Sequence, residues 1–337
     1  MKNHTVIASD KNRNDNNESH QPDIKIGLSA CLAGFEVRYN AGHKQSQLCL
    51  KTLSKHFSFK TFCPEVSAGF STPRPTMRLI GNPDEPTLTY TKDSSEDLTD
   101  QLKQGFQDEL TQLDDLDGYI LMSKSPSCGL ERVKVYQESG MPHQKFGMGL
   151  YAKALKEKYP LMPMEEEGRL HDDVLYDNFV TRVYAHHNFR KEVLEQPSIA
   201  NLMQFHASYK YMLMAHQQKD AKTLGKLVAS HKGLSFEELT TQYLALFMKI
   251  MSKPANRGNH TNALLHMLGY LKQSVSSDAR QSIVDAIYTY NNGMTPLVTP
   301  LTLLKHYFKQ YGSSYINMQR YLQPYPENIH PIRKYCR

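Results

Sequence analysis

A change of hydrophobic pattern near residue 168 limits the folds open to this chain more than any other feature. Between about residues 24 and 165, short strand-like runs alternate with helical patterns. From Gly168 onward the strand signals vanish, and helical periodicity punctuated by glycine and proline takes over. We therefore predict an α/β domain with an open, mostly parallel, Rossmann-like sheet, followed by an all-α domain of roughly six or more helices.

Three apolar runs in the first half predict strands. They cover residues 24–28, 57–62 and 118–122. A helical pattern spans about residues 98–113, where Ser94 and Asp97 resemble a capping box. Residues 81–93, with two prolines, predict a long loop. Strands separated by helices favour a parallel sheet in a single domain.

The domain limits follow from the same patterns. Residues 1–22 are polar and predict a disordered tail without the apolar core of a signal peptide. The α/β domain should span residues 23–165 and the all-α domain residues 168–337, with the boundary around the acidic run at 165–167. No run reaches the ~18 apolar residues of a membrane span, so we expect a cytoplasmic protein without a membrane partner.

The charge is unevenly distributed along the chain. Residues 170–337 hold 19 Lys and Arg against 11 Asp and Glu, whereas residues 1–169 hold 21 against 23. A basic second half suggests an anionic partner for that half, and an ordinary basic surface is the alternative.

Three cysteines each lie just beyond the end of a predicted strand: Cys31, Cys63 and Cys128. The carboxyl ends of parallel strands form the crevice in which open α/β sheets bind ligands. Three thiolates there would suit zinc or an iron–sulfur cluster and would leave one metal position open. The alternative is three small buried side chains. Cys49 is expected in the core, and Cys336 is expected to be incidental.

The neighbours of these cysteines favour a functional site. Cys63 is followed by Pro64 and Glu65, and Cys128 by Gly129 after a Ser-Pro-Ser stretch. Prolines fix such loops, and small residues let a bulky ligand approach. Glu65 is placed for proton transfer, and an ion-paired glutamate is the alternative.

Other candidate residues carry basic or aromatic side chains. Five of them lie near the cysteines and could hold a phosphate or a uracil oxygen, or could only fix loops. These five are Arg38, His43, Lys44, Arg74 and Arg78. In the helical half, interleaved groups could stack unpaired bases or pack the core; they are His206, Tyr209, Lys210, Tyr211 and His216. A phosphate track or a solvated face is expected at Lys305, His306, Lys309 and Arg320.

Three motifs of the first half resemble the thiouracil desulfidase family, also described as DUF523. In order they are SACLAGFEVRYNAGHK, CPEVSAGFSTPRP and SKSPSCG, within about residues 24–160. The second half resembles the DUF1722 domain in FHASYKYMLMAH, NALLHMLGYLK, PLVTPLTLLKHY and QRYLQPYP. This pairing is similar to the fused form linked to removal of sulfur from 4-thiouridine in tRNA.

The resemblance implies a [4Fe-4S] cluster on Cys31, Cys63 and Cys128, with the fourth iron open to the thiocarbonyl sulfur of the substrate. It implies catalytic roles for Glu65 and Ser125. Candidate substrate-binding residues are Arg38, His43, Arg74, Ser127 and Lys210, where Ser127 could be confused with Ser125 in role.

The hypothesis is a hydrolytic, non-redox replacement of C=S by C=O in thiolated tRNA, with no nicotinamide or flavin. The alternatives are desulfidation of free thiouracil or a thionucleotide, and a non-catalytic, metal-binding RNA-interaction protein.

Overall fold

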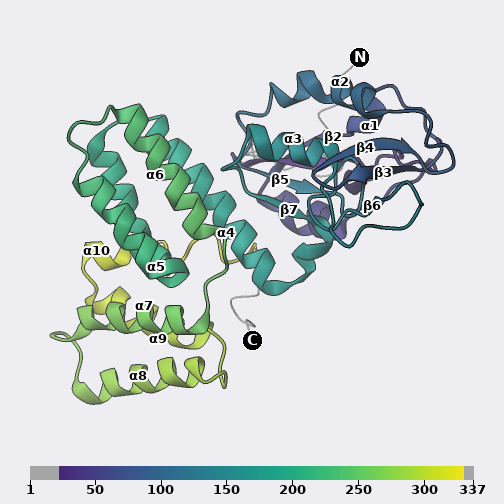
Figure 1. Ribbon diagram of the computed structural model, residues 1–337. Coiled ribbons are helices and arrows are strands. Elements are labelled where there is room, and N and C mark those ends of the chain that lie inside the picture. Colours follow the sequence, from purple (N-terminus) through teal and green to yellow (C-terminus); the bar gives the residue numbers. More distant parts are fainter. Residues whose placement is uncertain (1–22, 330–337) are drawn as a thin grey trace, which may run out of the picture. The chain divides into compact units, whose positions relative to one another are not determined.

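The computed structural model describes residues 23–329 and divides between His171 and Asp172 into two compact units (Figure 1). The first unit is an α/β domain with a parallel sheet, and the second is helical, as the hydrophobic patterns predict. The predicted tail at residues 1–22 and Cys336 lie outside the described residues.

A parallel four-stranded sheet forms the centre of the first unit. The order of its strands is β2-β1-β5-β7, and all neighbouring pairs are parallel. In β1, Ile26 and Leu28 are fully buried, as is typical of a strand covered on both faces. The bounds of the strands are β1 (Lys25–Ser29), β2 (Ser58–Phe62), β5 (Gly118–Leu121) and β7 (Met164–Glu166).

The path of the chain through this sheet creates a switch point. After β1 the chain adds β2 on one side, and it later adds β5 on the other side of β1. Open α/β sheets bind ligands outside the carboxyl ends of the strands at such a point. The segments that follow β1, β2 and β5 therefore meet at one edge of the sheet.

The acidic run at residues 165–167, expected at the domain boundary, belongs to the first unit. Glu165 and Glu166 end β7, and Glu167 begins the following 3-10 turn. All three carboxylates are largely buried, because they accept hydrogen bonds from residues of the same unit. The division of the chain comes after this turn.

A second, three-stranded sheet corrects the prediction of a long loop at residues 81–93. Its order is β4-β3-β6, with bounds β3 (Met77–Asn82), β4 (Glu85–Tyr90) and β6 (Val135–Tyr136). Strands β3 and β4 form a hairpin in which buried Leu79 and Leu88 are paired. Pro86 favoured the loop prediction because proline lacks the N–H group that a central strand needs. Strand β4 is an edge strand, where a missing N–H is tolerated.

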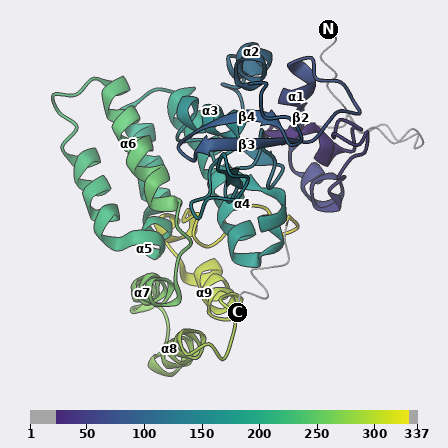
Figure 2. The same ribbon diagram turned by 45° about the vertical axis from the view of Figure 1, so that its right-hand side comes forward.

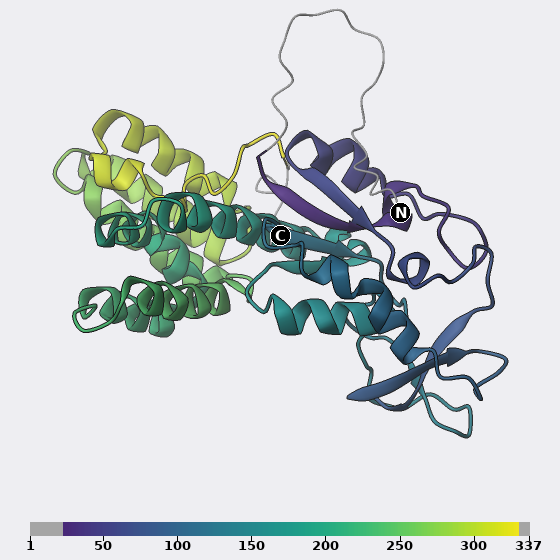
Figure 3. The same cartoon turned by 90° about the horizontal axis from the view of Figure 1, so that it is seen from above.

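Within residues 23–171, the first unit has three α-helices: α1 (Pro64–Ser67), α2 (Thr99–Leu110) and α3 (Leu150–Lys158). The predicted capping box at Ser94 is wrong, since α2 begins later than the sequence pattern suggests. Asp97 instead accepts a hydrogen bond from the backbone N–H of Thr99 at 2.8 Å. Helices α2 and α3 lie side by side (Figure 3).

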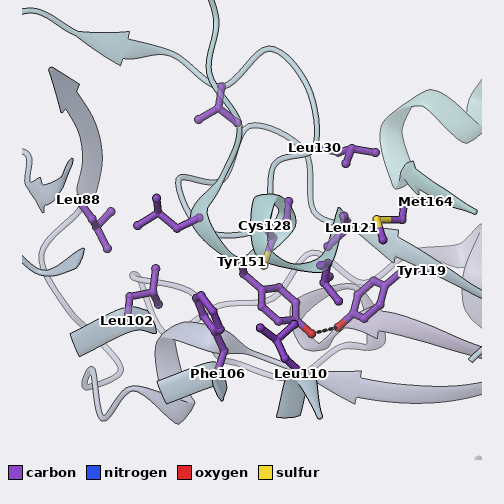
Figure 4. Packing of buried hydrophobic residues seen from close by; sticks show 14 of the residues in the cluster. Leu88, Leu102, Phe106, Leu110, Tyr119, Leu121, Cys128, Leu130, Tyr151 and Met164 are labelled. Atoms are coloured by element: carbon purple, nitrogen blue, oxygen red, sulfur yellow. Dashed lines mark hydrogen bonds between the residues drawn. The ribbon is translucent and has the colours of Figure 1, made fainter. Parts of the chain in front are cut away.

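The core between these two helices and the sheet is rich in aromatic rings. The ring centroid of Tyr151 lies 5.3 Å from that of Phe106 and 5.9 Å from that of Tyr119. The Tyr151 hydroxyl donates to the Tyr119 hydroxyl at 3.1 Å (Figure 4). Cys128 belongs to the same buried cluster, so the sheet edge rests on a rigid core.

Gly27 in β1 provides the space that Tyr119 occupies. A Cβ at Gly27 would lie 2.2 Å from ring atoms of Tyr119, which is buried and tied to Tyr151. We expect Gly27→Ala to destabilise the first unit by about 1–3 kcal/mol or more, because the ring cannot move away. Urea unfolding followed by circular dichroism measures the loss. Gly269→Ala, where a Cβ meets no atom within 4 Å, is the control. Equal midpoints for the two variants would contradict this account.

The second unit contains seven α-helices within residues 172–329. They are α4 (Asp173–Phe189), α5 (Ile199–Ala229), α6 (Phe236–Met251), α7 (Arg257–Leu268), α8 (Ser277–Asn291), α9 (Val298–Tyr311) and α10 (Ser314–Asn317). Figure 2 shows α7, α8 and α9 nearly end on. Side-chain caps fix the starts of five helices; they are Asp172, Ser198, Ser235, Asn256 and Ser276.

Aromatic packing joins α4, α5 and α6. The rings of Phe189 and Tyr243 stack at a centroid distance of 5.6 Å, and Phe205 contacts both. Tyr209, a candidate for base stacking, is buried among these rings and serves the core. Within residues 23–329, no helix has the length and hydrophobicity that crossing a bilayer requires.

Candidate metal and catalytic centre

Three thiols follow the adjacent strands β1, β2 and β5. Cys31 lies in the 3-10 turn directly after β1, and Cys63 is the N-cap of α1 directly after β2. Cys128 lies in the loop after β5. Cys31 and Cys128 are buried, and Cys63 is half-buried. The switch point of the sheet thus gathers the three cysteines, as the strand-end positions predict.

The thiols are close enough to affect one another electrostatically. Burial is the main cause that raises the pKa of Cys31 to about 11 and that of Cys63 to about 12. Burial also raises the pKa of Cys128 well above its usual value, and the negative charges of Cys63 and Cys31 raise it further. Glu65 raises all three pKa values. These thiols therefore become thiolates readily only beside a cationic partner, which a bound metal centre supplies.

The three thiols form a soft donor set of the kind that binds iron–sulfur clusters. Among residues 23–329, no group of three His, Cys, Asp or Glu side chains is arranged to hold a metal ion. In an iron–sulfur cluster, each cysteine binds a different iron. Three soft sulfur donors, buried together and without a fourth cysteine among them, match that kind of group.

Glu65, in the first turn of α1, is held on both carboxylate oxygens. Its Oε1 accepts a hydrogen bond from Ser127 Oγ at 2.7 Å. Its Oε2 accepts one from Arg74 Nε at 3.0 Å and another from an Arg74 terminal nitrogen. The Arg74 side chain is only 3% exposed and that of Glu65 13%. The carboxylate therefore has one fixed orientation beside the thiols.

Arg74 fixes loops rather than offering a free group to a ligand. Its Nη1 donates to the carbonyl oxygen of Ser71 and to Thr72 Oγ1, and its Nη2 donates to the carbonyl oxygen of Val37 at 2.9 Å. Together with the bonds to Glu65, these contacts engage all five N–H groups of the guanidinium. The structure thus favours the loop-fixing alternative over substrate binding.

Ser125 and Ser127 of the third motif have different roles. Ser125 Oγ accepts hydrogen bonds from the backbone N–H groups of Ser127 at 3.2 Å and Cys128 at 3.1 Å. It therefore shapes the turn that presents Cys128. Ser127 is fully buried, and its hydroxyl contacts Glu65. Of the two side chains, Ser127 is the one placed against the carboxylate.

Two further residues support the site, and the sequence reasoning missed both. Glu166 in β7 accepts hydrogen bonds from the backbone N–H groups of Leu130 and Glu131, just beyond Cys128. Ser29 at the end of β1 accepts from the Met122 N–H at 3.0 Å and hydrogen-bonds Cys128, which lowers the pKa of that thiol. Only its place two residues before Cys31 could have drawn attention to Ser29.

The other basic candidates near the thiols are placed differently. The positive charge of Arg38 lowers the pKa of Cys31, and its guanidinium lies 5.7 Å from the Tyr39 ring centroid. His43 Nδ1 accepts a hydrogen bond from the backbone N–H of Gln45 at 3.3 Å. The Arg78 guanidinium lies 5.4 Å from the ring centroid of Tyr136 in the second sheet. Arg38 is thus the candidate next to the thiols.

The remaining basic candidates of the second unit fall into two groups. One group lines a groove of about 1480 Å³ together with Glu192 and Glu327; it comprises Lys305, His306, Lys309 and Arg320. Lys305 pairs with Glu327 at 2.7 Å and Arg320 with Glu192 at 2.6 Å, so the positive charge there is partly neutralised.

The second group lies along α5. His206 Nδ1 is 3.3 Å from the Tyr243 hydroxyl, and His216 Nδ1 is 2.7 Å from the Lys253 carbonyl oxygen. Both imidazoles thus serve local packing. Lys210 is exposed and lies over the ring of buried Tyr211.

Comparisons with known proteins agree with this two-part organisation. Residues 26–167 match the sequence model of the family described as "2-thiouracil desulfurase", and residues 210–326 match "Protein of unknown function (DUF1722)". The uncharacterized protein YbgA of Escherichia coli (strain K12) is 31% identical over 154 residues, which are 45% of this chain and 91% of YbgA.

Two further proteins are similar to parts of the chain. The uncharacterized protein YbbK of Bacillus subtilis (strain 168) is 36% identical over 110 residues, 31% of this chain and 72% of YbbK. A solved structure of a [4Fe-4S]-dependent thiouracil desulfidase, TudS, is 27% identical and covers 44% of this chain and 93% of its own, with a TM-score of 0.36. By its two matched regions and its curated relatives, the chain belongs to the 2-thiouracil desulfurase family, in a form that carries a DUF1722 domain behind the desulfurase region.

Proposed function

We propose that this protein is an iron–sulfur-dependent desulfidase that converts 4-thiouridine in tRNA to uridine in the cytoplasm. The observation that carries the proposal is the meeting of three thiols, two buried and one half-buried, with one fixed carboxylate, Glu65, at the switch point of the sheet. Membership of the 2-thiouracil desulfurase family supports a thiolated pyrimidine as the reacting group. The excess of Lys and Arg in residues 170–337 supports a polyanion as its carrier.

The residues that would hold a [4Fe-4S] cluster are Cys31, Cys63 and Cys128. When bound, a cluster with three protein ligands supplies an iron position that attracts a soft thiocarbonyl sulfur and acts as a Lewis acid. Arg38 and Ser29 would stabilise the thiolate forms of Cys31 and Cys128, since each lowers the pKa of its neighbour.

The chain's own part in the chemistry is proton transfer and positioning. Water contributes the new oxygen and sulfur leaves as sulfide, so no oxidant or reductant is consumed. Arg74 occupies Oε2 of Glu65, which leaves Oε1 as the atom that accepts the proton of the attacking water. Ser127 Oγ, bonded to Oε1, keeps that atom oriented and is the nearest hydroxyl through which the proton can pass. Glu65 then returns the proton to the ring nitrogen or the departing sulfur.

A direct experiment compares three substrates on the full-length protein, purified and reconstituted without oxygen: 4-thiouridine-containing tRNA, the 4-thiouridine nucleoside and free 2-thiouracil. Mass spectrometry of the products and sulfide release measure turnover. We expect thiolated tRNA to be the best substrate. The family description favours free 2-thiouracil as the alternative, and a preference for it would replace tRNA in the proposal. Cluster-loaded protein that turns over none of the three would overturn the proposal and leave a non-catalytic RNA-interaction role.

A further inference from the structure

Four side chains from three separate elements of the second unit, one of them Tyr270, form a cluster of pairwise contacts. Lys210 and Tyr211 come from α5, Tyr270 from the 3-10 turn that follows α7, and Tyr315 from α10. The rings of Tyr270 and Tyr315 stack, with centroids 5.8 Å apart and planes inclined by 28°. The Tyr211 hydroxyl donates to the Tyr270 hydroxyl at 3.1 Å. We call these four residues the aromatic platform.

The platform differs from the tyrosines that pack the core of this unit. Tyr270 is 42% exposed, although two other rings hold it in place. Tyr315 is half-buried, and Tyr211 is buried beneath. An exposed ring that is fixed on its other sides presents a flat, pre-organised surface, and stacking on it costs little side-chain entropy.

The platform is cationic. The Lys210 ammonium lies 5.4 Å from the ring centroid of Tyr211 and 5.9 Å from that of Tyr315. Burial and the neighbouring hydroxyls raise the pKa values of Tyr211 and Tyr315, so both phenols stay neutral. Among residues 23–329, no Asp or Glu carboxylate forms a salt bridge with Lys210.

A small cavity adjoins the same lysine. Its volume is about 220 Å³, and Lys210 lines it together with Lys222, His206 and Gln218. Burial lowers the pKa of His206, so its ring stays neutral, and the positive charge of this cavity comes from the two lysines. Lys210 thus connects an aromatic surface with a second cationic group.

We propose that the aromatic platform binds one unpaired nucleotide of a single-stranded or looped RNA, with its base stacked on Tyr270 and its phosphate beside Lys210 and Lys222. A paired base hides its faces in the stack, so an exposed ring selects unpaired bases and tolerates any sequence. The lysines supply the phosphate contact that a neutral ring lacks. This inference rests on the proposed function for the choice of RNA, and it adds a named site on the second unit.

The test measures fluorescence anisotropy of a labelled oligouridylate of about ten nucleotides with the full-length protein at low salt. We expect Tyr270→Ala to weaken binding about tenfold, because one stacked base is lost. Tyr270→Phe should keep most of the affinity, since the ring remains. Lys210→Met should also weaken binding and should reduce the dependence of affinity on salt by about one phosphate contact. A duplex of equal length should bind without sensitivity to Tyr270→Ala.

Tyr288→Ala is the matched control, because Tyr288 on α8 is 48% exposed and is not part of the platform. The proposal fails if Tyr270→Ala binds the oligouridylate as tightly as Tyr288→Ala does. Turnover of free 2-thiouracil by Tyr270→Ala separates the two proposals. If Tyr270→Ala turns over free 2-thiouracil normally and binds RNA with unchanged affinity, the platform proposal is wrong and the proposed function stands. If cluster-loaded wild-type protein binds RNA but desulfidates none of the substrates, the proposed function is wrong and the platform proposal stands.

Discussion

Cys63→Ala, purified and reconstituted without oxygen, is expected to lose most of its bound iron and sulfide and more than about 100-fold of its desulfidation rate. Replacing residues that merely support metal ligands already costs about 10- to 100-fold in affinity or activity, so removing a ligand should cost more. Cys63 interacts electrostatically with both other thiols, since its charge raises the pKa of Cys128 and the charge of Cys31 raises the pKa of Cys63. Iron and sulfide analysis, the visible absorption of the cluster and sulfide release provide the measurements.

The chain offers a matched control for this experiment. Cys49 is also buried and its pKa is also raised by burial, but its neighbours are Ser46 and Glu167, not the trio. Cys49→Ala should keep its iron and its activity, with a modest loss of stability from the small cavity. If Cys63→Ala retains full cluster content while the control behaves normally, the ligand assignment is wrong.

The convergence of the cysteines could be predicted because it depends only on strand ends. Parallel strands bring their carboxyl ends to one edge of a sheet, so residues just after β1, β2 and β5 meet whatever lies between them. The partners of Glu65 could not be predicted in the same way. Arg74 reaches it from a loop, and Ser127 from a turn that Ser125 closes with its own side chain. Such contacts depend on loop geometry, which hydrophobic periodicity does not encode.

Side-chain burial explains the other failures of the sequence reasoning. An acidic run such as residues 165–167 is usually solvated, and only the structure reveals that Glu166 binds the backbone beyond Cys128. Likewise, interleaved aromatic and basic residues on α5 do not all face one way. Tyr209 is in the core, whereas Lys210 meets Tyr315 from a segment about a hundred residues away.

Glu65→Gln is expected to lower the desulfidation rate by about 10²- to 10⁴-fold while leaving the cluster content unchanged. The amide has the shape of the carboxylate, so its oxygen can still accept from Arg74 and its nitrogen can face Ser127 Oγ. The fold of the loop should therefore persist, and what is lost is the ability of Oε1 to take a proton. Single-turnover rates at matched iron content isolate that step from substrate binding.

The two neighbouring serines sharpen this prediction because their hydroxyls have different partners. Ser127→Ala leaves Oε1 of Glu65 without its donor and should slow the reaction about 10-fold or more at normal cluster content. Ser125→Ala instead frees the backbone N–H groups of Ser127 and Cys128, so cluster retention should fall together with the rate. If Ser125→Ala keeps its cluster and loses more activity than Ser127→Ala, then Ser125 and not Ser127 is the proton partner of Glu65. Full activity in Glu65→Gln at normal iron content would mean that another group moves the proton and that Glu65 only holds Arg74 in place.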